Sequence, residues 1–362
     1  MPTLFDPIDL GAIKAPNRIL MAPLTRGRST ARHVPTPRMA TYYAQRATAG
    51  LIITEATGIS QEGLGWPFAP GIWSDEQVEA WKPITAAVHD AGGRIVVQLW
   101  HMGRIVHPDF IDGEQPVSSS ATTAPGDGHT YKGKQPYVEA RALRVDEIPR
   151  LLNDYEKAAK NAIEAGFDGV QLHAANGYFI DEFLRDNANF REDEYGGSIE
   201  NRIRLLGEVA QRLVDTIGAD RVSVRLSPNG DSQGVNDSSP YELFGAAAAL
   251  LDKIGVAFLE LREPDFDGTF GAAEVEPVAP TIRKAFRGPL VLNSDYTVEK
   301  AQAALDSGVA DAIAFGRPFL ANPDLPERLE VGAPLNKDVM ATWYSQGDEG
   351  YIDYPALEPV IA

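Results

Sequence analysis

Residues 148–178 read IPRLLNDYEKAAKNAIEAGFDGVQLHAANGY, and they contain the repeating unit from which the fold is predicted. Apolar residues recur at helical spacing in the first half, at Ile148, Leu151, Leu152, Tyr155, Ala159, Ala162 and Ile163. Gly166 follows as a helix stop, and residues 169–173 form a short apolar run that is typical of a strand buried on both faces. The stretch therefore predicts a helix and then a buried strand, with polar side chains just after the strand.

The same unit recurs along the chain. Seven further apolar runs are predicted as strands, at residues 19–22, 51–55, 95–99, 222–226, 257–261, 290–293 and 311–315. Helical patterns lie at residues 201–217, 241–254, 278–286 and 298–307. Ser74 and Gln77 form a capping box at the head of another helix, which Pro83 is expected to kink or restart.

Eight strands alternating with helices predict a (β/α)8 TIM barrel. A doubly wound open sheet is the alternative, and it normally has a glycine-rich phosphate loop after its first strand. Here the first strand ends in Ala22-Pro23-Leu24-Thr25, which is not such a loop.

Two segments depart from a plain barrel. Residues 3–16 are predicted to form a hairpin that closes the N-terminal end of the barrel. Residues 103–145, after the third strand, are rich in Pro, Gly, Ser and Thr, and a loop of this length at the C-terminal mouth usually caps an active site. No shift in composition divides the chain, so residues 1–362 are expected to form one domain.

The composition excludes several classes of function. The chain has no cysteine, which rules out disulfides, thiolate metal sites and iron–sulfur clusters, and no metal is expected. A formal net charge of −18 disfavours nucleic acid and anionic membranes as partners. No basic region followed by an apolar run begins the chain, and no apolar stretch could span a membrane. We expect a soluble cytoplasmic protein with a small-molecule partner, and the oligomeric state stays open.

The residues at or just after the ends of the predicted strands are candidates for the site, because barrel enzymes place their reactive groups there. They include Pro23, Thr25, Ala56, Gln98, Trp100, His101, His173, Asn176, Tyr178, Arg225, residues 293–295, Gly316 and Arg317. His173 and Asn176 are three residues apart in a turn, so both can donate hydrogen bonds to one oxygen. Tyr178 offers a phenolic proton and Arg225 a fixed cation. Gly316-Arg317 lies where barrels commonly bind a phosphate. Singly, each residue could equally be a packing residue or half of a structural ion pair.

Several motifs in one order give these residues a common meaning. They are 21–26 (MAPLTR), 98–104 (QLWHMGR), 169–178 (GVQLHAANGY), 193–202 (DEYGGSIENR) and 315–318 (FGRP), with Gly350-Tyr351 in the C-terminal tail. Over nearly its whole length the chain resembles the Old Yellow Enzyme family of FMN-dependent ene-reductases, in particular its N-ethylmaleimide reductase-like members.

The resemblance implies a role for each matching residue. Pro23, Thr25 and Ala56 would line the flavin, Gln98 and Arg225 would hold its pyrimidine and ribityl parts, and Gly316 and Arg317 would bind the FMN phosphate. His173 and Asn176 would bind the substrate oxygen, and Tyr178 would be the proton donor. Trp66, Trp100 and Tyr351 would shape the substrate pocket. The implied reaction is reduction of an activated C=C bond, or of nitro compounds or nitrate esters, with NADPH or NADH as hydride donor.

The sequence departs from the commonest family pattern at four places. Asn176 stands where a second His is common, and Trp66 where a Tyr is frequent. Residues 293–295 lack the usual glycines, and Asp295 is an unexpected neighbour for a phosphate, so Arg317 is the better candidate there. Thr25 replaces the Cys of one branch of the family.

Three other functions fit a barrel of this size. A metal-dependent hydrolase needs a His-x-His pair on an early strand, which the sequence lacks. A phosphosugar isomerase or aldolase would leave Gln98, Arg225 and the His–Asn–Tyr group unexplained. A flavin-binding barrel without catalysis is the third, and turnover of an enone distinguishes it.

Overall fold

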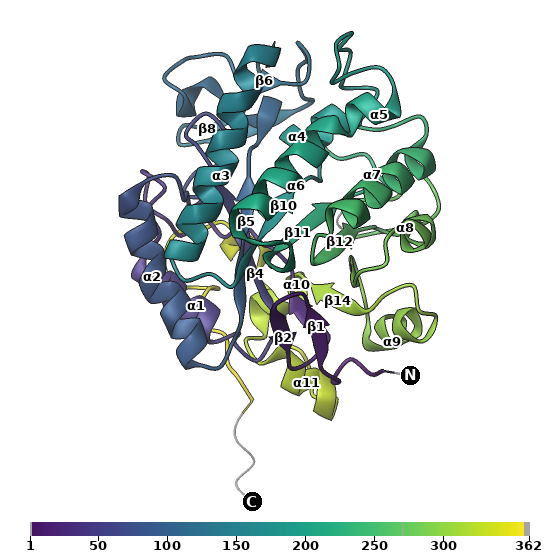
Figure 1. Ribbon diagram of the computed structural model, residues 1–362. Coiled ribbons are helices and arrows are strands. Elements are labelled where there is room, and N and C mark those ends of the chain that lie inside the picture. The colour runs from purple at the N-terminus through teal and green to yellow at the C-terminus, as the bar shows by residue number, and fades with distance from the viewer. Residues whose placement is uncertain (1, 270, 358–362) are drawn as a thin grey trace, which may run out of the picture.

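A computed structural model describes residues 2–269 and 271–357 (Figure 1). At its centre is a closed barrel of eight parallel strands, β3 (Ile19–Met21), β4 (Ile52–Gly58), β5 (Ile95–Trp100), β10 (Gly169–His173), β11 (Val222–Leu226), β12 (Phe258–Arg262), β13 (Leu290–Asn293) and β14 (Ala312–Phe315). The strands follow one another in chain order, and β14 pairs with β3 to close the ring. The predicted barrel is confirmed, and each predicted strand overlaps an observed one.

Helices surround the barrel (Figure 1). They are α1 (Pro37–Ala44), α2 (Asp75–Asp90), α3 (Ile148–Glu164), α4 (Phe179–Leu184), α5 (Ile199–Arg202), α6 (Arg204–Ile217), α7 (Pro240–Ile254), α8 (Ala279–Ala285), α9 (Val298–Asp306), α10 (Arg317–Ala321) and α11 (Leu325–Val331). The capping box of Ser74 and Gln77 is present at the start of α2. The helix α2 continues through Pro83, with Trp81, Ile84 and Val88 buried on either side of it, so it does not restart there. The expected single helix over 201–217 is divided, because a turn at Ile203 separates α5 from α6.

A hairpin of β1 (Ile8–Leu10) and β2 (Ile13–Ala15) closes the N-terminal end of the barrel, as predicted. Its apolar side chains pack against inward-facing barrel residues, which include Leu20, Ile53, Val96, Phe258 and Val291. The amide of Ala12 donates to the carbonyl oxygen of Asp220, just before β11. The lower half of the barrel is therefore filled with side chains, and the space for a ligand lies toward the C-terminal mouth.

The segment 103–145 forms short elements over that mouth. It contains the 3₁₀ turns Gly103–Ile105 and Pro108–Phe110, the strands β6 (Val117–Ser118) and β9 (Arg141–Ala142), and a hairpin of β7 (Asp127–Thr130) and β8 (Gly133–Pro136). Gly103 begins the segment at φ +62°, and a Cβ there would lie 2.3 Å from the Glu182 carboxylate, so only glycine fits. Within the described ranges, no helix is both long enough and apolar enough to cross a membrane.

Candidate active site

The C-terminal mouth of the barrel opens into two cavities that share residues. The larger one has a volume of about 1020 Å³, enough for a cofactor and a small substrate together. The smaller one, of about 110 Å³, is lined by nine residues, Pro23, Thr25, Ala56, Gln98, Trp100, His173, Asn176, Tyr178 and Arg225. All nine were predicted as site residues, and they come from five different strands and the loops after them. Trp66, Gly316 and Arg317 line the larger cavity.

The floor of the site is a continuous chain of buried polar side chains. Gln98 Nε2 donates to Gln171 Oε1 (2.7 Å), and Gln171 Nε2 donates to Glu260 Oε2 (2.8 Å). Arg225 binds Glu260 Oε1 through Nη1 (2.8 Å) and Asn293 Oδ1 through Nη2 (2.8 Å). Burial raises the pKa of Glu260, and the Arg225 charge opposes that shift. Because every link needs its neighbour, the chain fixes which polar atoms Gln98 and Arg225 present to the cavity.

The strand β10 ends at His173, and the following turn carries Asn176 and Tyr178 into the cavity. The rings of His173 and Tyr178 lie 5.0 Å apart at 90°, and Trp100 contacts the Tyr178 ring edge-on at 4.9 Å. Burial, reinforced by the Arg225 charge, lowers the pKa of His173 to about 3, so its imidazole is neutral at pH 7. Burial also raises the pKa of Tyr178, which keeps its proton on the phenol. A neutral hydrogen-bond donor and a protonated acid thus stand side by side.

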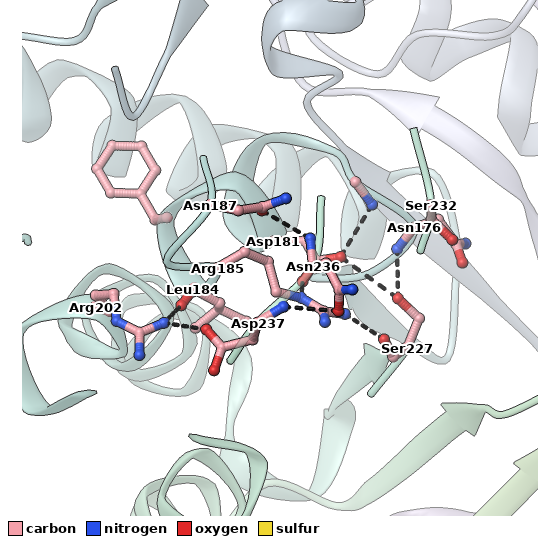
Figure 2. Close-up of polar contacts among 12 residues, drawn as sticks. Asn176, Asp181, Leu184, Arg185, Asn187, Arg202, Ser227, Ser232, Asn236 and Asp237 are labelled. Carbon is pink, nitrogen blue, oxygen red and sulfur yellow. Dashed lines mark hydrogen bonds and ion pairs between the residues drawn. The ribbon is translucent and has the colours of Figure 1, made fainter. Parts of the chain in front are cut away.

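Asn176 adopts the left-handed conformation, with φ at +59°. Asparagine tolerates this region better than most side chains, and a short amide fits the turn. Its backbone N–H donates to Ser227 Oγ (2.7 Å), and the next N–H, of Gly177, donates to Asp181 Oδ2 (3.0 Å), as Figure 2 shows. Arg262 Nη1 lies 3.5 Å from Asn176 Oδ1, which turns the amide nitrogen toward the other side.

The residues present fit a flavin. Three buried donors of the small cavity, His173 Nδ1, Trp100 Nε1 and Arg225 Nε, have no partner within the described part of the chain. Buried polar groups are rarely left without a partner, so a polar ligand is expected to meet them. At the far side of the larger cavity, Arg317 bonds to the Asp295 carboxylate and to Thr269 Oγ1. A phosphate would have to compete with Asp295 for this guanidinium.

One predicted substrate residue lies elsewhere. Tyr351 is fully buried and stacks on Tyr42 at 4.1 Å, with the Arg28 guanidinium 4.6 Å from its ring. It lines neither cavity, so its assignment to the substrate pocket is corrected. Tyr344, from the same C-terminal tail, lines the larger cavity instead.

Other cavity residues were missed from the sequence. Arg262, at the end of β12, and Gln233, in the loop after β11, both line the larger cavity. Arg262 follows directly after the predicted sixth strand, so its strand-end position was an available signal. Gln233 belongs to a loop without a recognisable motif, so no signal in the sequence pointed to it as a cavity residue.

Comparison with known proteins agrees with this geometry. The NADH:flavin oxidoreductase / NADH oxidase family model matches residues 3–336. The chain belongs to this family. It is 66% identical to the old yellow enzyme homologue from Zymomonas mobilis, with a TM-score of 0.97 over 98% of this chain and 100% of that one. Morphinone reductase gives 45% identity and a TM-score of 0.94, covering 98% of this chain and 96% of that chain.

Plant enzymes are similar as well. The 12-oxophytodienoate reductase 1 of Oryza sativa subsp. japonica is 43% identical over 99% of this chain and 94% of its own length. The protein is thus an FMN-dependent NAD(P)H oxidoreductase of the Old Yellow Enzyme type, acting on activated alkenes, as the sequence predicted.

Proposed function

We propose that the two cavities form one catalytic site, in which His173 and Asn176 bind the oxygen of an α,β-unsaturated carbonyl compound and Tyr178 protonates its α-carbon. The observation that carries this assignment is the small cavity. Nine residues chosen from the sequence line a space of about 110 Å³, with His173 and Tyr178 ring to ring at 5.0 Å.

The cofactor would be held from three sides. Gln98 and Arg225 would bind its pyrimidine edge and ribityl chain, with Pro23, Thr25 and Ala56 against the ring, and Gly316 and Arg317 at the phosphate. When bound, FMN would supply the hydride chemistry that links oxidation of NADH or NADPH to reduction of the alkene at its β-carbon.

The protein contributes hydrogen bonds and a proton. Negative charge grows on the carbonyl oxygen of the substrate as its β-carbon is reduced, and the donors of His173 and Asn176 stabilise that charge more than they stabilise the ground state. The neutral imidazole of His173 donates through its single ring N–H and, unlike an imidazolium, is not a competing acid. Tyr178, whose pKa is raised by burial, gives its proton to the α-carbon, as a general acid does.

Several finer points belong to the same proposal. A nitro group or nitrate ester presents an oxygen of similar geometry, so such compounds are alternative substrates. Trp66 and Trp100 would shape the pocket around the substrate. The acidic charge and the lack of cysteine support a cytoplasmic location, and the partners are small molecules, not nucleic acid or membrane.

The variant Tyr178→Phe separates the two half-reactions. It removes the proton donor and keeps the ring, so reoxidation of the reduced enzyme by cyclohexenone should slow by about 10²-fold or more. Reduction of the flavin by NADPH should stay close to the parent rate. Both rates are measured by anaerobic stopped-flow absorbance. Enone reduction at the parent rate would remove Tyr178 from its assigned role.

A further inference from the structure

A buried hydrogen-bonded chain holds the Asn176 turn from behind, outside both cavities. We propose that Ser227 and Asp181 are positioning residues, which fix the direction of the Asn176 amide and so set the affinity of the site for an oxygen-bearing ligand. The proposal rests on the role of Asn176 given above.

The chain runs from the turn into the protein interior (Figure 2). Ser227 lies directly after β11 and is buried. Its Oγ accepts the Asn176 N–H at 2.7 Å, and the same Oγ lies 3.5 Å from Asp181 Oδ2. Since the hydroxyl oxygen receives the amide proton, its own proton points to the carboxylate. Asp181 Oδ2 also accepts the Gly177 N–H at 3.0 Å.

The carboxylate that ends this chain has a fixed charge partner. Arg185, one helical turn further along the chain, donates from Nε to Asp181 Oδ1 at 2.7 Å, and both side chains have 0% exposure. Arg185 also bonds to the carbonyl oxygen of Ser227 and lies 4.7 Å from the Phe244 ring. A buried pair of this kind is costly to disturb, and its main contribution is to hold groups in place.

The turn needs such support because two successive residues have positive φ. Asn176 is at +59° and Gly177 at +75°, and a Cβ on Gly177 would lie 2.2 Å from the carbonyl oxygen of Ser232. A non-glycine residue in the left-handed region is strained, and the surrounding contacts must offset that strain at Asn176. The N–H groups of Asn176 and Gly177, bound to Ser227 and Asp181, provide that offset. By fixing the backbone of the turn, they also fix the direction in which the Asn176 side chain points.

The loop after β11 is anchored by a second buried ion pair. Asp237 Oδ2 pairs with Arg202 Nη1 at 2.5 Å (Figure 2). It also accepts the Asp186 N–H at 3.0 Å. That loop brings Ser232 and Gln233 to the larger cavity. The positioning contacts are therefore built into the loop and the helix α4 together, and they do not depend on a surface contact.

The test compares Ser227→Ala with a control at Ser223, in the strand β11 that ends just before Ser227. Ser223 is buried, donates to the carbonyl oxygen of Val170 at 3.3 Å and lines neither cavity, so Ser223→Ala is the same chemical change without the relay. The readout is the Kd of p-chlorophenol for the FMN-loaded protein, titrated by the change in the flavin spectrum. Loss of one hydrogen bond that positions a donor should weaken phenol binding by about 3- to 10-fold. Ser223→Ala should bind as the parent does.

Two further measurements keep the outcome decisive. Ser227→Thr retains the hydroxyl and should keep the phenol Kd within about twofold of the parent value. A twofold change is smaller than the effect expected from loss of one hydrogen bond. Asp181→Asn places an amide donor against Arg185 and should weaken phenol binding further. Parent phenol affinity in folded, FMN-loaded Ser227→Ala would overturn the proposal, even with a lower Tm, and so would equal losses in Ser227→Ala and Ser223→Ala. If instead the parent protein bound FMN but no phenol, the proposed function itself would fail.

Discussion

Replacing Glu260 with glutamine is expected to destabilise the protein and to change how the floor of the cavity meets its ligand. Glu260 is fully buried and binds Arg225 at 2.8 Å, and Arg225 itself is only 6% exposed in its side chain. Glutamine keeps the shape and one oxygen but removes the negative charge. Arg225 is then left as a buried cation without a counter-charge.

The cost follows from this geometry. Removing one partner of a buried ion pair costs roughly 3–5 kcal/mol, and the acceptor that glutamine retains places this case at the lower end. A second effect comes from the amide. In the parent protein, Gln171 Nε2 donates to Glu260 Oε2. In the variant, the new amide nitrogen would face this donor, so Gln171 and then Gln98 would have to rotate their amides. At 2 °C or so per kcal/mol for a chain of this size, Tm should fall by about 6 °C.

The assay is thermal unfolding of the FMN-free protein at pH 7, with FMN affinity measured in parallel by fluorescence titration. Glu263→Gln is the control, because Glu263 is a partly buried carboxyl directly after β12 that accepts from the backbone N–H groups of Val278 (2.7 Å) and Ala279 and forms no ion pair within the described residues. Its Tm should change less. A Tm of Glu260→Gln within about 1 °C of the parent, a small fraction of the expected shift, would refute the account of the floor as an obligatory charged chain.

Three further predictions concern single titratable groups. Burial lowers the pKa of His101 to about 3, below its value of about 6.5 in an unfolded chain, so stability falls as pH drops from 6.5 to 3. In urea titrations over this range, His101→Gln should reduce the dependence of the unfolding free energy on pH by about one bound proton. An unchanged pH dependence would contradict the shifted pKa. Burial raises the pKa of Glu182 to about 8, so its contribution to stability is lost as pH rises from about 4.5 to 8. The Tm of Glu182→Gln minus the Tm of the parent should therefore be larger at pH 8 than at pH 5. The same difference at both pH values would be evidence against a proton on the buried Glu182. Asp295→Asn removes a negative charge bonded to Arg317, so FMN should bind a few-fold more tightly at low salt by fluorescence titration; weaker binding would separate Asp295 from the phosphate site.

Much of the fold could be predicted because a parallel barrel buries its strands on both faces. Runs such as 169–173 and 222–226 are apolar enough to locate without ambiguity, and strand direction then brings their C-terminal ends to one mouth. That rule alone placed His173, Gln98 and Arg225 near one another.

The remaining features depend on contacts between distant residues. Gly350-Tyr351 looked like a cavity motif, yet the tail turns Tyr351 inward onto Tyr42 and leaves Tyr344 at the cavity. The spacing of Asp181 and Arg185 is that of an ordinary surface pair on a helix, and only packing against β11 and α7 buries it completely. No local pattern in the sequence distinguishes such a buried pair from an exposed one.

The most direct test of the catalytic assignment is an anaerobic visible spectrum of the purified, FMN-loaded protein, recorded before and after NADPH and again after cyclohexenone. The flavin band should bleach with NADPH and return when the enone is added, which establishes both half-reactions in one cuvette. If the protein holds FMN but its flavin band does not return with cyclohexenone or a nitro compound, the proposed roles are contradicted. Those roles are substrate binding by His173 and Asn176 and proton donation by Tyr178.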